Sequence, residues 1–184
     1  MVRHVRPDEI EKRARLLLKQ AGVEAAPVPI ERVAKQLGIR IERSDLGPDC
    51  SGVLVREGGR AVIGVNWDHH SNRQRFTIAH EIAHFQLHDG TTYVDSGYRL
   101  HFRDLEAGSG TKREEIEANR FAAALLMPAQ WVLEDFRKRP FDLAAEGEDL
   151  EEMARRFEVS TQAMAIRLTT VLNVGHDKDD GEES

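Results

Sequence analysis

Apolar residues recur at helical spacing near the start of the chain. Over residues 8–20 they lie three or four positions apart, which is the pattern of a helix that buries one face. Gly22 follows as a stop signal. A second run, residues 30–37, starts after Pro29 and ends before Gly38, and it predicts a shorter helix. We therefore expect a helical beginning.

Strand-like stretches follow these helices. Residues 39–42, 52–56 and 60–65 alternate between apolar and polar positions or carry β-branched runs. Gly58 and Gly59 separate the last two stretches, and a glycine pair suits a tight hairpin turn. These signals predict a small, mostly antiparallel sheet.

The rest of the chain is predicted to be helical, with one long irregular segment. Helices are expected over residues 72–88, 112–127, 129–137, 148–157 and 160–172. Ser71 and Gln74 stand at the spacing of a capping box before the first of these helices. Residues 89–113 predict a loop with a short strand near residues 98–102, and a loop of this length commonly has a function.

Composition and charge exclude several classes of protein. The 184 residues carry 26 basic against 32 acidic side chains, a net charge of -6, and 40% are hydrophobic, as in globular proteins. Acidic residues crowd into residues 176–184, which predicts a disordered tail. No apolar run is long enough for a membrane span or a signal peptide, and one cysteine, Cys50, cannot form an internal disulfide. We expect a cytoplasmic protein that does not contact membranes.

The clearest chemical signal is the sequence HEIAH at residues 80–84. Four residues turn a helix by about 400°, so His80 and His84 project from one face and can bind one zinc ion. Glu81 can lie beside an open coordination position and take a proton from water there. The alternative interpretation is a pair of hydrogen-bonded histidines on a partly buried helix face.

A third metal ligand is expected from the helix over residues 112–127, because catalytic zinc commonly has three protein ligands and one water. We favour Glu115 over Glu117, with Glu114 the weakest candidate. Glu115 and Asn119 share a face with small alanines that permit close packing, and Asn119 could accept the second proton of a ligand histidine. Each of these acids could instead be a solvated carboxylate at a helix start.

The remaining histidines and tyrosines are weaker candidates. His88 lies four residues after His84, but eight residues span about 12 Å of helix, so His80, His84 and His88 cannot meet one ion. We expect His88 to pack or to line a cleft. Residues that could lie in the loop before the helix, or polarise a scissile carbonyl, are His69, His70, Tyr93, Tyr98 and His101.

The last two predicted helices resemble a helix-turn-helix around a tight turn at residues 158–159. DNA reading would require basic side chains on the second helix, which has only Arg167. Arg155 and Arg156 lie on the first helix, after a run of acids. We therefore expect this pair to serve packing or substrate docking, and we do not expect DNA binding.

Together these stretches resemble the ImmA/IrrE family of zinc-dependent metalloendopeptidases. The resemblance is carried by RQRFTIAHEIAH at residues 73–84, by EIEANRFAAALLMP at residues 115–128, and by flanking patterns at residues 30–39 and 154–168. It implies an α+β, gluzincin-like core and hydrolysis of a peptide bond. By this resemblance the zinc ligands are His80, His84 and Glu115, and the catalytic acid and base is Glu81.

The resemblance also implies a substrate and a domain organisation. The substrate would be a helix-turn-helix repressor, whose cleavage derepresses stress-response or mobile-element genes. We expect a metalloprotease domain over residues 1–140, a helical extension over 141–175 and the acidic tail over 176–184. The alternative is a non-catalytic regulator that binds a repressor or DNA.

Overall fold

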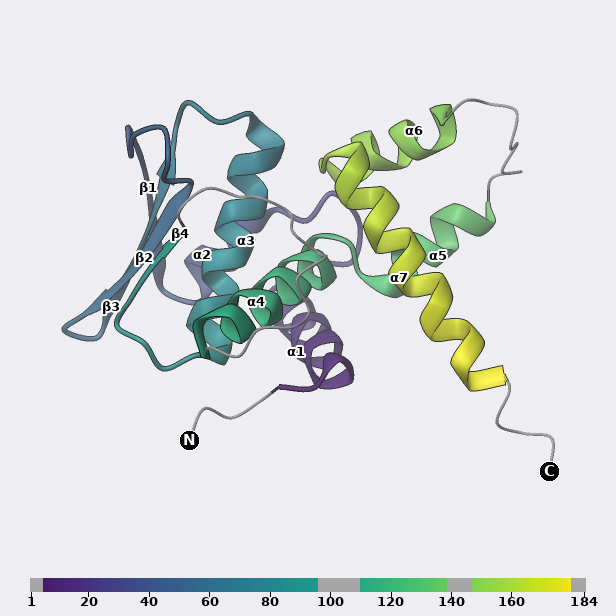
Figure 1. Ribbon diagram of the computed structural model, residues 1–184, viewed down its shortest axis with the longest axis horizontal. Helices are drawn as coiled ribbons and strands as arrows, with labels where there is room; N and C mark the ends of the chain where they lie inside the picture. Colours follow the sequence, from purple (N-terminus) through teal and green to yellow (C-terminus); the bar gives the residue numbers. More distant parts are fainter. Residues whose placement is uncertain (1–4, 96–109, 139–146, 180–184) are drawn as a thin grey trace.

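The computed structural model describes residues 5–95, 110–138 and 147–179. Within them a small sheet is covered on one face by helices (Figure 1). The elements are α1 Pro7–Gln20, α2 Ile30–Gln36, β1 Ile39–Ser44, β2 Gly52–Glu57, β3 Arg60–Asn66, α3 Ser71–Leu87, β4 Thr92–Asp95, α4 Gly110–Leu126, α5 Ala129–Arg137, α6 Glu148–Phe157 and α7 Thr161–Asp179. The α+β class expected from the sequence is confirmed.

The sheet has the strand order β1-β3-β2-β4. β1 runs parallel to β3, whereas β2 is antiparallel to both β3 and β4. Gly58 and Gly59 have φ values of 57° and 76°, which a two-residue hairpin turn of the mirror-image type requires. The mostly antiparallel sheet is therefore confirmed, with β1 as its parallel edge.

One strand lies where the sequence predicted an irregular loop. β4 occupies residues 92–95 and pairs with β2 through Val94 opposite Val53 and Tyr93 opposite Leu54. The strand expected near residues 98–102 lies outside the described residues. β4 brings Tyr93 to the inner face of the sheet, where it packs against the core.

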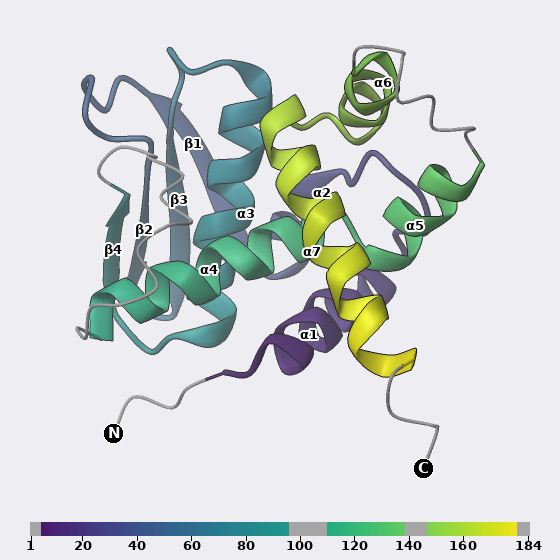
Figure 2. The same cartoon turned by 45° about the vertical axis from the view of Figure 1, so that its right-hand side comes forward.

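Helix α3 runs through the centre of the molecule, between the sheet and the other helices (Figure 2). Eight consecutive residues of α3, from Thr77 to His84, are buried. α4 crosses α3 closely, and the small side chains of Ala118 and Ala122 are fully buried. The close approach expected from the alanines of α4 is therefore confirmed.

The predicted capping box at the start of α3 is wrong. His70 occupies the N-cap position, and its Nδ1 atom accepts a hydrogen bond from the main-chain N–H of Asn72 at 3.2 Å. The Gln74 side chain instead donates to the carbonyl oxygens of Trp67 and His69. Ser71 is the first residue of the helix rather than its N-cap, and the sequence spacing alone could not show this.

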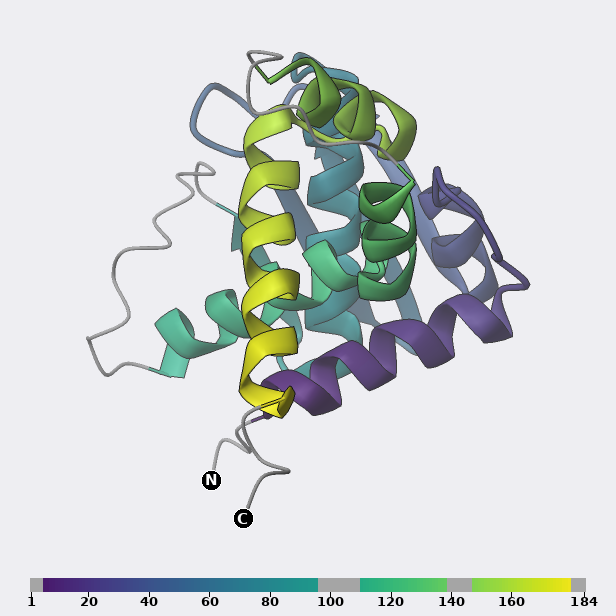
Figure 3. The same ribbon diagram turned by 90° about the vertical axis from the view of Figure 1, so that its right-hand side faces the viewer.

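α6 and α7 form the expected helix pair and pack on the body of the molecule. The Arg167 side chain of α7, 4% exposed, donates to the Met127 carbonyl at 2.8 Å and forms an ion pair with Glu11 of α1. Figure 3 shows α7 descending toward α1. α7 extends to Asp179, so it includes the first residues of the expected tail, and residues 180–184 lie outside the described residues.

Over the residues that the structure describes, no helix has both the length and the apolar character needed to cross a bilayer.

Candidate metal centre

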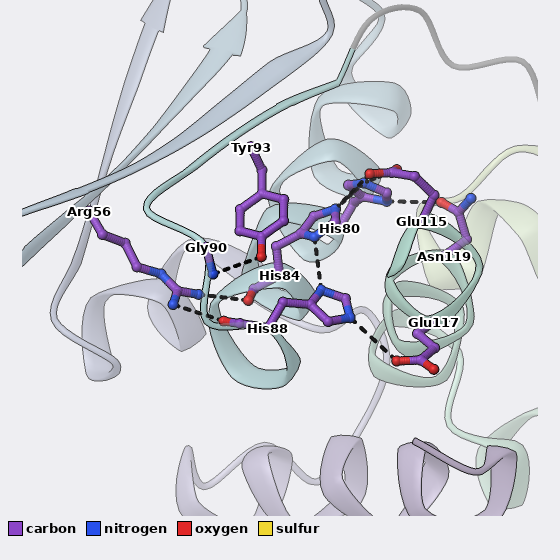
Figure 4. Close-up of polar contacts among 9 residues, drawn as sticks. All are labelled: Arg56, His80, His84, His88, Gly90, Tyr93, Glu115, Glu117 and Asn119. Carbon is purple, nitrogen blue, oxygen red and sulfur yellow. Dashed lines mark hydrogen bonds and ion pairs between the residues drawn. The ribbon is translucent and has the colours of Figure 1, made fainter. Parts of the chain in front are cut away.

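Three side chains from α3 and α4 converge at the crossing of these helices (Figure 4). The Nε2 atoms of His80 and His84 lie 3.0 Å apart. The Glu115 carboxylate reaches both, with Oε2 at 3.1 Å from His80 Nε2 and Oε1 at 3.3 Å from His84 Nε2. In the described part of the chain, this is the one group of three or more His, Cys, Asp or Glu side chains that could hold a metal ion.

The three side chains differ in their exposure to solvent. The His80 and His84 side chains are at most 2% exposed, while the Glu115 side chain is 45% exposed. The imidazoles are therefore fixed in the interior, and the group is accessible from the side of α4. A catalytic metal site needs such an approach, since it keeps one coordination position for water or substrate.

The protonation of the group suits a divalent cation. Burial lowers the pKa of His84, which keeps its imidazole neutral near pH 7. Burial would raise the pKa of Glu115, but the neighbouring His80 and His84 side chains outweigh this effect and hold the pKa well below its usual range. Two neutral imidazole nitrogens and one carboxylate are a donor set that zinc and similar ions take in proteins.

His80 is oriented by the neighbouring helix. Its Nδ1 atom lies 2.9 Å from the Oδ1 atom of Asn119 in α4. An amide oxygen only accepts hydrogen bonds, so His80 Nδ1 carries the proton and His80 Nε2 keeps its lone pair for a cation. The contact expected between Asn119 and a ligand histidine is present.

Glu117, the alternative third ligand, lies away from the three-donor group. Its Oε2 atom is 3.4 Å from His88 Nε2, and its Oε1 atom accepts from the main-chain N–H of Val5 at 3.1 Å. His88 in turn places its Nδ1 atom 3.0 Å from His84 Nδ1. From the sequence we expected His88 to pack or to line a cleft; the signal for its contact with His84 was the repeated four-residue spacing.

Glu81 is fully buried on α3 and faces strand β2. A Cβ atom at Gly52 would lie 2.3 Å from Thr77 Cγ2 and 3.4 Å from Glu81 Oε1. Only glycine therefore lets β2 pass this close to α3 beside the Glu81 carboxylate. This role of Gly52 could not be predicted from the sequence, because it depends on packing between distant segments.

Comparison with known proteins assigns the fold and the chemistry at a coarse level. The family described as the IrrE N-terminal-like domain, a peptidase family, matches residues 34–169. The chain belongs to this family. The match includes α3, α4 and the helix pair α6 and α7, so the resemblance seen in the sequence is confirmed.

Two further comparisons set the limits of that assignment. No curated protein matches the chain. A solved structure of a Mycobacterium tuberculosis transcriptional regulator is similar, with a TM-score of 0.59 and 17% sequence identity. The similarity covers 85% of this chain but 45% of that one, so the chain spans less than half of its length. At this identity the likeness shows the fold alone.

A side chain from the sheet holds the C-terminal end of α3. Arg56 of β2 donates to the carbonyl oxygens of His84 at 2.6 Å and His88 at 2.9 Å. The His84 carbonyl also accepts from the main-chain N–H of His88 at 3.1 Å, so Arg56 adds a second donor there. The guanidinium carbon also lies 4.9 Å from the centre of the Phe85 ring. Sequence reasoning missed Arg56, because its role depends on how the sheet packs on α3.

Tyr93 packs on a residue of the three-donor group. Its ring stacks on His84 with 4.2 Å between centroids, and its hydroxyl accepts from the Gly90 N–H at 2.9 Å. The hydroxyl considered for polarising a carbonyl acts as an acceptor in this contact, which does not use its own hydrogen. His69 and His70 lie in the loop before α3, outside the three-donor group. The remaining sequence candidates, Tyr98 and His101, lie outside the described residues.

Proposed function

We propose that this chain is a zinc-dependent endopeptidase that cleaves a protein substrate. The observation that carries the proposal is the convergence of His80, His84 and Glu115, with donor atoms within 4.8 Å of one another, in a chain of a peptidase family. Both imidazoles turn Nε2 toward the shared point while their Nδ1 atoms have partners elsewhere. A zinc ion bound between these nitrogens and the Glu115 carboxylate would use all three donors.

In this proposal the chain's own residues have separate tasks. His80, His84 and Glu115 hold the zinc ion. When bound, zinc supplies Lewis acidity toward a peptide carbonyl and makes water more acidic. A carboxylate oxygen of Glu81 takes a proton from water as the water oxygen bonds to the carbonyl carbon. Glu81 then delivers that proton to the amine nitrogen as the carbon–nitrogen bond breaks.

The substrate we propose is a helix-turn-helix repressor in the cytoplasm, whose cleavage releases stress-response or mobile-element genes. The family supports a protein substrate, and the similar solved structure is named a transcriptional regulator. The burial of Arg167 removes the one basic side chain in residues 160–172 that a DNA-reading role would use. This observation favours the protease over a DNA-binding regulator.

The test combines a defined substrate with one substitution. Zinc-loaded protein is mixed with the helix-turn-helix regulator encoded beside it, and mass spectrometry is used to find a single cut. Glu81→Gln should bind zinc like the parent but cut roughly 100 to 10,000 times more slowly, because it removes the general base. Glu114→Gln changes the same charge on α4 and should cut normally.

Two results would contradict the proposal. Cleavage by Glu81→Gln at the parental rate would remove Glu81 from the reaction. A parent that binds the regulator and zinc but never cuts would support the non-catalytic alternative.

A further inference from the structure

A buried chain of polar atoms leads from the three-donor group to the N-terminal segment. It runs from His84 Nδ1 to His88 Nδ1 at 3.0 Å, from His88 Nε2 to Glu117 Oε2 at 3.4 Å, and from Glu117 Oε1 to the Val5 main-chain nitrogen at 3.1 Å. His88 is 6% exposed and Glu117 is 2% exposed, so water does not replace these contacts. Figure 4 shows His88 between His84 and Glu117.

With Glu117 as a carboxylate and His88 as a neutral imidazole, the direction of each hydrogen in this chain follows from the Val5 end. The main-chain N–H of Val5 can only donate, so Glu117 Oε1 accepts. Glu117 Oε2 also accepts, so His88 Nε2 carries a hydrogen. A neutral His88 then presents a lone pair at Nδ1, and His84 must donate to it from its own Nδ1. This leaves His84 Nε2 as a lone pair that faces His80 and Glu115.

We infer that His88 and Glu117 are positioning residues that hold His84 in the tautomer whose Nε2 atom can bind the metal ion. The inference rests on the metal site of the proposed function and extends it beyond the three ligands. Asn119 does the same for His80 directly, whereas His84 depends on two side chains and one main-chain group. The N-terminal segment before α1 is thereby connected to the metal site.

The substitution Glu117→Gln tests this directly, because an amide cannot accept at both ends. If its oxygen meets the Val5 N–H, its NH2 group faces His88 Nε2 and reverses the hydrogens along the chain. His84 Nε2 would then carry a hydrogen and be blocked. If the amide turns over, its NH2 group meets the Val5 N–H instead, and that buried contact is lost. The second arrangement sets two buried donors against each other, so the first arrangement, which blocks His84 Nε2, is favoured and weakens zinc binding.

Zinc affinity of the full chain is measured by competition with a chelator. We expect Glu117→Gln to bind zinc roughly 10 to 100 times more weakly than the parent, the usual effect of removing such a supporting contact. Glu114→Gln is the matched control, with the same change of charge on the same helix, and it should bind zinc like the parent. Equal affinity of the two variants would overturn the inference.

A second measurement needs no substitution and so does not depend on the folding of a variant. Long-range proton–nitrogen correlation spectra of the zinc-loaded parent distinguish the two tautomers of each histidine. We expect a hydrogen on Nε2 of His88 and on Nδ1 of His84. A hydrogen on His88 Nδ1 would overturn the inference while leaving the proposed function intact. A parent that binds no zinc would contradict the proposed function as well.

Discussion

In α3 and α4, polar side chains from two helices turn toward one point, whereas in α6 and α7 polar side chains contact other parts of the molecule. The first pair places three donors of His80, His84 and Glu115 around a shared centre. In the second pair, Arg167 meets Glu11 and the Met127 carbonyl, and Arg156 meets Asp135 at 2.7 Å.

The difference distinguishes side chains that can bind a ligand from side chains whose contacts only stabilise the fold. The contacts of Arg167 are complete within the protein, because a guanidinium donates and its partners accept. When the Nδ1 atoms of His80 and His84 carry the hydrogens, both Nε2 atoms are acceptors. The two Nε2 atoms then cannot hydrogen-bond to each other, and a cation can bind to both. Substitutions in the two regions should therefore separate metal binding from stability.

The largest effect is expected from Glu115→Ala. At a zinc concentration of 100 times the dissociation constant, zinc should stabilise the parent by about 2.7 kcal/mol. The variant should lose this stabilisation, while its metal-free stability changes little because the Glu115 side chain is half exposed. Urea unfolding with and without zinc measures both quantities, with Glu114→Ala as the control. Equal zinc stabilisation in the two variants would exclude Glu115 as a ligand.

Arg167→Met should show the opposite behaviour. Loss of hydrogen bonds from a buried charged group costs roughly 1.5–3 kcal/mol of unfolding free energy. Zinc affinity should stay at the parental value, because Arg167 lies on α7 and contacts α1 and the end of α4. The measurements are urea unfolding and chelator competition. A variant with unchanged stability would show that α7 does not depend on this anchor.

Gly52→Ala addresses the contact between β2 and α3. The added Cβ would lie 2.3 Å from Thr77 Cγ2, and overpacking of this kind costs roughly 1–3 kcal/mol. Thr77→Ser removes the clashing methyl group, so the double variant should regain most of the lost stability in thermal unfolding. If the double variant is no more stable than Gly52→Ala, the clash with Thr77 is not the cause.

The smallest effect is on the pH dependence of the metal-free protein. Burial lowers the pKa of His84 from 6.5, so below about pH 6.5 the unfolded chain binds a proton that the folded chain does not. Stability should be complete above that pH and decline below it, by at most about 1.4 kcal/mol per pH unit for this group. Urea unfolding between pH 7.5 and pH 5.5 measures the decline, which His84→Asn should reduce. An equal decline in that variant would assign it to other groups.

The parts of this account that the sequence could predict are those that depend on local spacing. The helical repeat located α3 and α4, and HEIAH placed His80 and His84 on one face. Glu115 and Asn119 followed from the same periodicity. The hairpin at Gly58 and Gly59 was also predictable, because two adjacent glycines are a local signal for a tight turn.

What could not be predicted depends on contacts between distant segments. β4 has four residues, and its position is defined by pairing with β2 rather than by its own alternation. The roles of Arg56, Gly52 and Glu117 arise only when the sheet, α3, α4 and the N-terminal segment are packed together. The helix starts at Ser71, one residue earlier than the predicted capping box requires, so His70 is the cap.

X-ray absorption at the zinc edge of the loaded full chain tests the central claim most directly. The account predicts one zinc ion per chain, with two imidazole nitrogens and a carboxylate oxygen at roughly 2.0–2.2 Å and no sulfur neighbour. A sulfur ligand from Cys50, or fewer than two imidazoles at the metal, would contradict it.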